Sequence, residues 1–230
     1  MPDPAPSGDR TVERGVAVGA LAAYDAVARA YDGQFRNELD AKPLDRGLLA
    51  AFVELAGTGT IADVGCGPGH VTRLLAQRHP DVIGVDISRA MIAVAREHAP
   101  ELAFEVGSML DLPAADGTWA GVVALYSIIH LTVEERAIAS REFARVIRPG
   151  GWLLLAFHVD SSEFAAGEVN HLTSWFGERV QLDGYFLEPS NVLAPLQAAG
   201  FALVAKLERL PTPDVEYPSR RCYLLCRRRS

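Results

Sequence analysis

Asp63, Asp86 and His130 each lie at or near the end of an apolar run that has the length of a buried strand. The first run leads into a turn in which glycine occurs at every second position, from Gly65 to Gly69. Glycine lacks Cβ, so such a turn can adopt positive φ and lets a ligand approach the backbone closely. A helix beginning at about Val71 would point unpaired N–H groups at that ligand. The spacing predicts a nucleotide-type site at the carboxyl end of a parallel strand.

Asp86 ends the next apolar run, one helix and one strand after the glycines. That position places its carboxylate at the end of the neighbouring strand, where it can accept hydrogen bonds from ribose hydroxyls. The alternative role is to cap the helix that follows, but Ser88 is available for that. We therefore interpret Asp86 as a ribose ligand.

His130 follows the uniformly apolar run from Gly121 to Leu125, together with Tyr126 and Ser127. Ligands in open α/β sheets bind beyond the carboxyl ends of the strands, so these side chains are expected to face the reacting centre. Histidine titrates near neutral pH and suits a general base. An isolated histidine is more often structural, and that alternative stays open.

Taken in order, these motifs resemble the class I S-adenosylmethionine-dependent methyltransferases. The glycine turn has the form D-x-G-x-G-x-G, starting at Asp63, whereas a dinucleotide fingerprint would have glycine at His70. A turn from Arg145 to Gly151 resembles the family's R-x-L-x-P-G-G, and it precedes a predicted strand over 152–158. The resemblance covers nearly the whole chain, from about Tyr24 onward.

The resemblance implies S-adenosylmethionine as cofactor. Its glycine turn would pass under the methionine part, Ile87 would pack on adenine, and Met91 would lie either near adenine or in the core. The family usually has G-D-x-x-x-L-P after the third strand, but Ser108 replaces the adenine-binding acid in this chain. The Ser108 hydroxyl and the Met109 backbone would then contact the adenine edge. The cofactor-binding residues predicted on this basis are Tyr24, Tyr31, Asp63, Gly65, Cys66, Gly67, Gly69, Asp86, Ile87, Met91, Ser108, Met109, Tyr126 and Ser127.

Tyr24 and Tyr31 lie on one face of a predicted helix over 16–39. They match the Y-D-x-(I/V)-A-x-x-Y pattern that small-molecule methyltransferases often carry before the first strand. The pattern implies that this helix covers the cofactor. The alternative is that both tyrosines are core residues of an amphipathic helix.

The implied fold is α/β and Rossmann-like, with a seven-stranded, mostly parallel sheet in the order 3-2-1-4-5-7-6 and helices on both faces. We expect one domain over 16–230 after a disordered start, 1–15. Within it, 16–57 would form lid helices and 159–187 a substrate-cap insertion, although an ordinary packing loop is the alternative for the latter. The predicted substrate-binding residues are His130, His158, His171, Trp175 and Tyr185.

Composition limits the partners. The net charge of −7 argues against nucleic acid, because phosphate binding needs clustered Lys and Arg. The sequence has no apolar run long enough to cross a bilayer and no recognisable secretory signal, so we expect no membrane partner and a cytoplasmic location. The 3 cysteines have no histidine partners at zinc-site spacing, and we predict no metal. The sequence leaves the oligomeric state open.

The predicted reaction is transfer of the sulfonium methyl group to an O, N, S or C nucleophile of a small molecule, with His130 as base. Members of the family with these motifs act on secondary metabolites, quinone-like rings or small acids. Two alternatives remain. The chain could bind S-adenosylmethionine or S-adenosylhomocysteine without transferring a methyl group, or, less in keeping with the motifs, it could be an NAD-dependent oxidoreductase.

Overall fold

The computed structural model describes residues 16–230. The predicted disordered start, 1–15, lies outside the described residues. Within 16–230, no helix is long and apolar enough to cross a membrane. No group of three or more potential metal-ligating side chains occurs within the same range.

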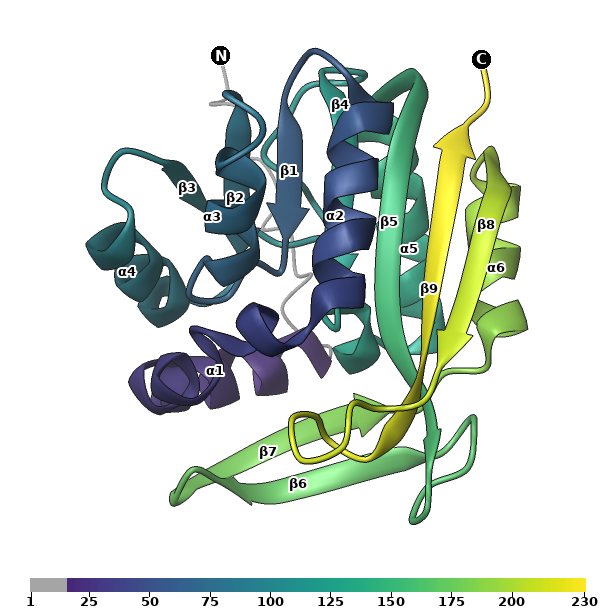
Figure 1. The fold of residues 1–230 in the computed structure, drawn as a ribbon. Coiled ribbons are helices and arrows are strands. Elements are labelled where there is room, and N and C mark those ends of the chain that lie inside the picture. The colour runs from purple at the N-terminus through teal and green to yellow at the C-terminus, as the bar shows by residue number, and fades with distance from the viewer. Residues whose placement is uncertain (1–15) are drawn as a thin grey trace, which may run out of the picture.

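A seven-stranded sheet forms the centre of the molecule (Figure 1). Five strands are parallel to their neighbours, and the last two pair antiparallel at one edge. The strand order is β3-β2-β1-β4-β5-β9-β8, which matches the predicted order 3-2-1-4-5-7-6 once only the strands of this sheet are counted. The strands are β1 (Ile61–Val64), β2 (Val82–Asp86), β3 (Ala103–Val106), β4 (Trp119–Leu125), β5 (Ile147–Ser161), β8 (Phe201–Arg209) and β9 (Ser219–Arg228).

Helices cover both faces of the sheet, with α2 on the near side in Figure 1 and α5 and α6 on the far side. The helix predicted over 16–39 ends at Phe35 and a short 3₁₀ turn follows, and the helix predicted from about Val71 begins at His70. The helical elements are α1 (Val16–Phe35), η1 (Glu38–Ala41), α2 (Pro43–Ala56), α3 (His70–Ala76), α4 (Arg89–His98), η2 (Ile128–His130), α5 (Val133–Val146) and α6 (Pro189–Ala198).

Local sequence signals explain several helix boundaries. Pro43 occupies the first turn of α2, where its missing N–H is not needed. The Ser88 hydroxyl accepts from the Met91 N–H and caps α4. At the start of α5, Thr132 and Glu135 form a reciprocal capping box, as their spacing predicts.

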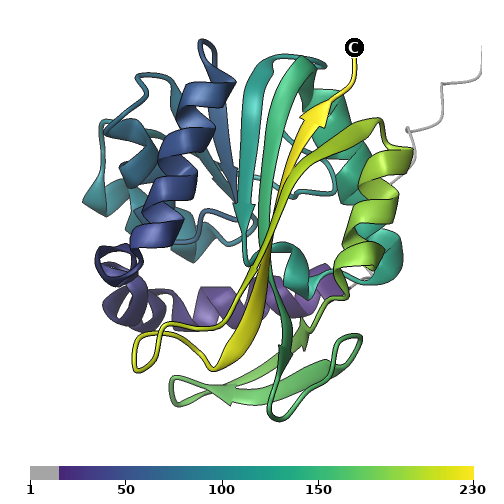
Figure 2. The ribbon, with the colours of Figure 1, turned by 45° about the vertical axis from the view of Figure 1, so that its right-hand side comes forward.

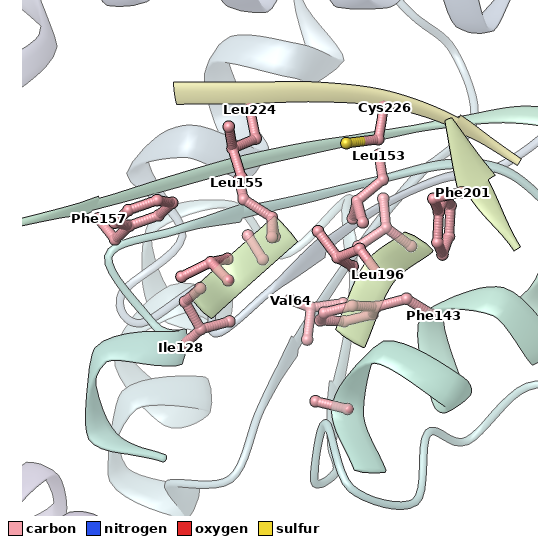
Figure 3. Close-up of a cluster of buried hydrophobic side chains, with 14 of the residues drawn as sticks. Val64, Ile128, Phe143, Leu153, Leu155, Phe157, Leu196, Phe201, Leu224 and Cys226 are labelled. Atoms are coloured by element: carbon pink, nitrogen blue, oxygen red, sulfur yellow. The ribbon is translucent and has the colours of Figure 1, made fainter. Parts of the chain in front are cut away.

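The main core lies between the sheet and the helices α5 and α6 (Figure 3). Leu155 and Phe157 of β5 point toward this core, and Phe143 of α5 and Leu196 of α6 pack from the other side. Cys226 of β9 is fully buried in the same cluster. Burying each large apolar side chain contributes roughly 1.5–3 kcal/mol, so this cluster fixes the strand positions that hold the site.

The segment 159–187 folds as a β-hairpin rather than as an irregular loop. Its strands β6 (Val169–Trp175) and β7 (Glu178–Tyr185) form a separate two-stranded antiparallel sheet. Val180 and Leu182 of β7 pack against the inner face of α1. In Figures 1 and 2, α1 and this hairpin lie next to the end of the sheet toward which the β1 arrow points. The carboxyl ends of the parallel strands therefore face α1 and the hairpin.

Of the two predicted lid helices, only α1 lies over the strand ends. The α2 side chains Leu49 and Phe52 are buried against the sheet, together with Ile61 of β1. Helix α2 is therefore one of the sheet's covering helices.

Candidate functional site

Two cavities adjoin at the carboxyl ends of the parallel strands. The first encloses about 750 Å³ of space, its open mouth included. The second encloses about 1090 Å³ on the same basis and extends between α1, the hairpin and the loop before β9. Four side chains line both cavities: Tyr24, Tyr31, Tyr126 and His130.

The glycine turn forms one wall of the first cavity. Gly65 has φ +76°, and a Cβ added to it would lie 2.3 Å from the Ser127 Cβ. A Cβ on Gly67, at φ +52°, would meet nothing closer than 4.0 Å and would project between Met91 and Tyr31. The turn is held to β2 because the Gly65 N–H donates to the Val85 carbonyl at 2.7 Å. The result is a bare backbone cradle of the kind that a ligand can approach closely.

Asp86 of β2 stands opposite that cradle with its carboxylate bonded only to backbone. One oxygen accepts from the Gly67 N–H and the other from the Ser88 N–H, both at 2.8 Å. Burial raises the pKa of Asp86, and these hydrogen bonds oppose that shift. Among the ion pairs of residues 16–230, none includes Asp86. A cavity-lining carboxylate without a cation has unused lone pairs for ligand hydroxyls.

Asp63 lies behind the glycine turn and is almost completely buried. It accepts a 2.6 Å hydrogen bond from the Thr72 hydroxyl. Burial raises the pKa of Asp63 to about 6 despite that bond. With Glu38 and His70, it lines a smaller cavity under the glycine turn.

Ile87, Ser108 and Met109 line the far end of the first cavity. The Ser108 hydroxyl accepts from the Leu110 N–H at 3.1 Å, which leaves its own proton free to donate. Asp111 is exposed and is not among the residues that line this cavity. The edge of the cavity is therefore polar but uncharged where the family usually has an acid.

His130 ends η2 and is 8% exposed. Its Nδ1 lies 2.7 Å from the Asp183 carbonyl of β7, and its Nε2 lies 2.8 Å from the Tyr24 hydroxyl. Burial lowers the pKa of His130, while the Asp183 carbonyl opposes the shift. The imidazole is therefore neutral at pH 7.

Tyr126 follows β4 with φ +55°, a conformation that is costly for a residue with a Cβ. Its hydroxyl lies 2.9 Å from that of Tyr223, which in turn donates to Asp45 at 2.7 Å. Its ring lies 5.0 Å from the imidazole of His158. The strained backbone and this buried chain of hydroxyls hold the Tyr126 ring between the two cavities.

The second cavity has an aromatic wall and a charged end. Trp175 packs edge-on against Tyr24 and Tyr31, with ring centroids 5.4 and 5.6 Å apart. At the charged end, Lys42 and Arg221 lie near Glu216. Burial, together with the charges of Arg221 and Lys42, lowers the pKa of His158 to about 3. The cavity suits a partly apolar, flat molecule with a polar end.

The structure gathers most of the predicted site residues around these cavities but not all. Met91 is fully buried in the core, and Gly69 packs against Phe104, so neither lines a cavity. Cys66 is also buried and lines only the smaller cavity. His171, with 72% of its side chain exposed, bonds to the Asp183 carboxylate at 2.6 Å and lines none of the three cavities.

Several lining residues were missed by the sequence predictions. Ala20 lies one helical turn before Tyr24 on the same face, so the spacing could have indicated it. The second cavity also includes Phe35, which lies one helical turn after Tyr31 and could have been indicated in the same way, and Asn170, for which no local pattern exists. The remaining residues that the predictions missed around it are Glu38, Lys42, Ile129, Leu172, Leu182, Gly184, Phe186, Val215, Glu216, Tyr217 and Arg221.

Comparisons with known proteins agree with this geometry. A family model described as a methyltransferase domain matches residues 61–151. The chain is 30% identical over 174 residues to a 2-phytyl-1,4-naphtoquinone methyltransferase from Thermosynechococcus vestitus, covering 66% of this chain and 76% of that protein. It is 36% identical over 110 residues to a trans-aconitate 2-methyltransferase from Delftia acidovorans, covering 46% of this chain but only 41% of that protein.

A solved structure has the same fold. The DhpI–SAH complex superimposes with a TM-score of 0.70 at 22% identity, covering 95% of this chain and 99% of that one. With the methyltransferase domain model and the naphtoquinone methyltransferase relative, this identifies the chain as a member of the class I S-adenosylmethionine-dependent methyltransferases.

Proposed function

We propose that this chain transfers a methyl group from S-adenosylmethionine to an O, N, S or C nucleophile of a small molecule bound in the second cavity. One observation carries the proposal: two adjoining cavities share a wall made by Tyr24, Tyr31, Tyr126 and His130. Such an arrangement lets two bound molecules meet at one point. Catalysis of this kind depends mainly on holding the partners at near-attack distance.

The first cavity fits the cofactor by its own chemistry. Gly65 and Gly67 offer bare backbone, and the cation-free carboxylate of Asp86 suits the ribose hydroxyls. Ile87 would pack on adenine, with Ser108 at its edge. When bound, S-adenosylmethionine supplies an electrophilic methyl group on a sulfonium.

His130 is the residue best placed to manage a proton. It lines both cavities, and its lowered pKa keeps one nitrogen unprotonated at pH 7. A positioned general base contributes typically 10²–10⁴-fold to a rate. Helix α1 and the hairpin pack together over the site.

The acceptor is proposed to be a small molecule with a flat, partly apolar body. The aromatic wall formed by Trp175 and its neighbours favours such a body. Two relatives are named for a naphtoquinone and for trans-aconitate, both small molecules. The net charge of −7 also disfavours a nucleic-acid acceptor.

The function is tested by incubating the protein with methyl-labelled cofactor and a panel of phenols, quinols, amines, thiols and carboxylic acids. We expect label in at least one product, with an equal amount of S-adenosylhomocysteine. The variant His130→Gln should slow that turnover by roughly 10²-fold or more, with little change in S-adenosylhomocysteine affinity. Unchanged turnover would remove His130 from the mechanism. Tight cofactor binding with no transfer across the panel would instead indicate a binding protein.

A further inference from the structure

Both nitrogens of His130 are already engaged. The Asp183 carbonyl, 2.7 Å from Nδ1, can only accept a hydrogen bond, so Nδ1 carries the proton. In the neutral imidazole, Nε2 is then an acceptor, and the Tyr24 hydroxyl 2.8 Å away donates to it. The tautomer of His130 is therefore set by the hairpin backbone, and its only basic nitrogen is occupied by Tyr24.

Tyr24 is placed to meet the acceptor itself. Its side chain lines both cavities, and its ring is fixed edge-on between Tyr31 and Trp175, with centroids 5.8 and 5.4 Å away. The ring also lies 5.4 Å from the imidazole of His130. A nucleophile in the second cavity can thus contact the Tyr24 oxygen, whereas the Nε2 of His130 already accepts a hydrogen bond from that oxygen.

Building on the proposed function, we propose that Tyr24 is a catalytic residue that passes the acceptor's proton to His130. The acceptor's X–H bond breaks, and its proton forms a new O–H bond at the Tyr24 oxygen. At the same time, the original Tyr24 proton moves to Nε2 of His130. The electron pair left on X forms the new bond to the methyl carbon as the carbon–sulfur bond of S-adenosylmethionine breaks, and the pair of that bond stays on the sulfur of S-adenosylhomocysteine.

The charges balance at each end of the step. Tyr24 is neutral before and after, and His130 becomes an imidazolium whose Nδ1–H still donates to Asp183. Once the product leaves, the imidazolium returns its proton to water. Burial raises the pKa of Tyr24 and lowers that of His130, so the pair rests as neutral phenol and neutral imidazole. The relay therefore operates only when an acceptor delivers a proton.

The hydrogen-bonded pair can be tested without turnover by NMR of protein carrying ¹⁵N-labelled histidine. We expect a protonated Nδ1 and an unprotonated, hydrogen-bonded Nε2 on His130. Tyr24→Phe should shift the Nε2 resonance strongly. The matched control Tyr31→Phe also removes a cavity-lining hydroxyl, but one that does not bond to His130, and should shift it little. A proton on Nε2, or an Nε2 chemical shift that does not change in Tyr24→Phe, would overturn the relay.

Kinetics then tests the catalytic role with two probes of one shape, 2-naphthol and 2-naphthalenethiol. At about pH 8 an aromatic thiol is ionised and a phenol is not, so only the naphthol needs a base. Tyr24→Phe should slow naphthol methylation at least tenfold more than thiol methylation, while Tyr31→Phe should affect both by one factor. If Tyr24→Phe slowed methylation of both probes equally, Tyr24 would have only a packing role and the relay would be wrong. If wild-type protein methylated neither probe, that would count against the proposed function. The NMR result would still show whether Tyr24 and His130 form the hydrogen-bonded pair that the relay needs.

Discussion

Replacing Asp86 by asparagine should weaken cofactor binding by a factor that follows from its contacts. The carboxylate accepts from two backbone N–H groups and keeps further lone pairs for two ribose hydroxyls. Hydrogen bonds to a charged group contribute about 1.5–3 kcal/mol each and neutral ones about 0.5–1.5 kcal/mol, so removing the charge from the acceptor of two such bonds costs roughly 2–3 kcal/mol, or about 30- to 150-fold in Kd. In addition, the NH₂ group of the introduced amide would oppose one of the two backbone N–H donors, those of Gly67 and Ser88.

Calorimetric titration with S-adenosylhomocysteine measures this loss directly. Asp111→Asn is the matched control, because Asp111 is an exposed acid of the neighbouring loop that lines none of the cavities. The control should bind within about twofold of wild type, since surface substitutions usually have effects under 0.5 kcal/mol. Circular dichroism should show that both variants are folded. A Kd for Asp86→Asn close to that of wild type would refute the assignment of Asp86 to the ribose.

The same carboxylate predicts a pH dependence. Burial raises the pKa of Asp86, and the charged form is the better acceptor for ribose hydroxyls. Cofactor affinity should therefore be highest at neutral pH, and it should fall as the pH drops through that raised pKa. The loss should begin above the pH expected for an ordinary aspartate, near 3.9. The Asp86→Asn variant should lack this acid limb.

Two further predictions concern stability. Gly65→Ala should lower the free energy of unfolding by roughly 2–5 kcal/mol in urea titration, because Gly65 has positive φ and an added Cβ would clash with Ser127. Gly33→Ala, in open space on α1, should raise the free energy of unfolding by roughly 0.5–1 kcal/mol. Equal effects of the two substitutions would contradict this prediction. Arg209→Met should cost roughly 3–5 kcal/mol by leaving the buried Glu216 without its main partner. Burial would raise the pKa of Glu216, but the Arg209 bonds outweigh it and lower that pKa from 4.5 to about 2. This contribution is present above pH 4.5 and is lost as the pH falls toward 2, so wild-type stability should fall over that window and the variant's should fall less.

The central strands β1, β2 and β4 could be predicted from the sequence because they are short, almost wholly apolar runs bounded by turns. β4 is buried along nearly its whole length, and Gly65, Gly67 and Asp86 follow such strands at fixed offsets. The hairpin could not be predicted in this way. Most residues of β6 are exposed or only partly buried, so the strand carries no strong apolar signal.

The site was only half predictable for a related reason. Side chains near strand ends, such as His130, can be located from the strands alone. The partner that orients His130 is the backbone carbonyl of Asp183, and a carbonyl leaves no trace in the sequence. Likewise, Arg209 and Asp45 form a 2.9 Å ion pair although 164 positions separate them. Contacts of that kind follow from the completed fold and not from any local pattern.

The two cavities are formed by different parts of the chain. Sequence similarity to other methyltransferases therefore says different things about each cavity. The cofactor cavity is built largely by the strand ends and turns within 61–151, which is the segment that the family model matches. Most of the second cavity comes from α1, the hairpin and the loop before β9, outside that segment. Tyr24 and His130 join the two halves through one hydrogen bond. Differences in acceptor among relatives should therefore concentrate in α1, the hairpin and that loop, while the glycine turn and Asp86 stay tied to the shared cofactor.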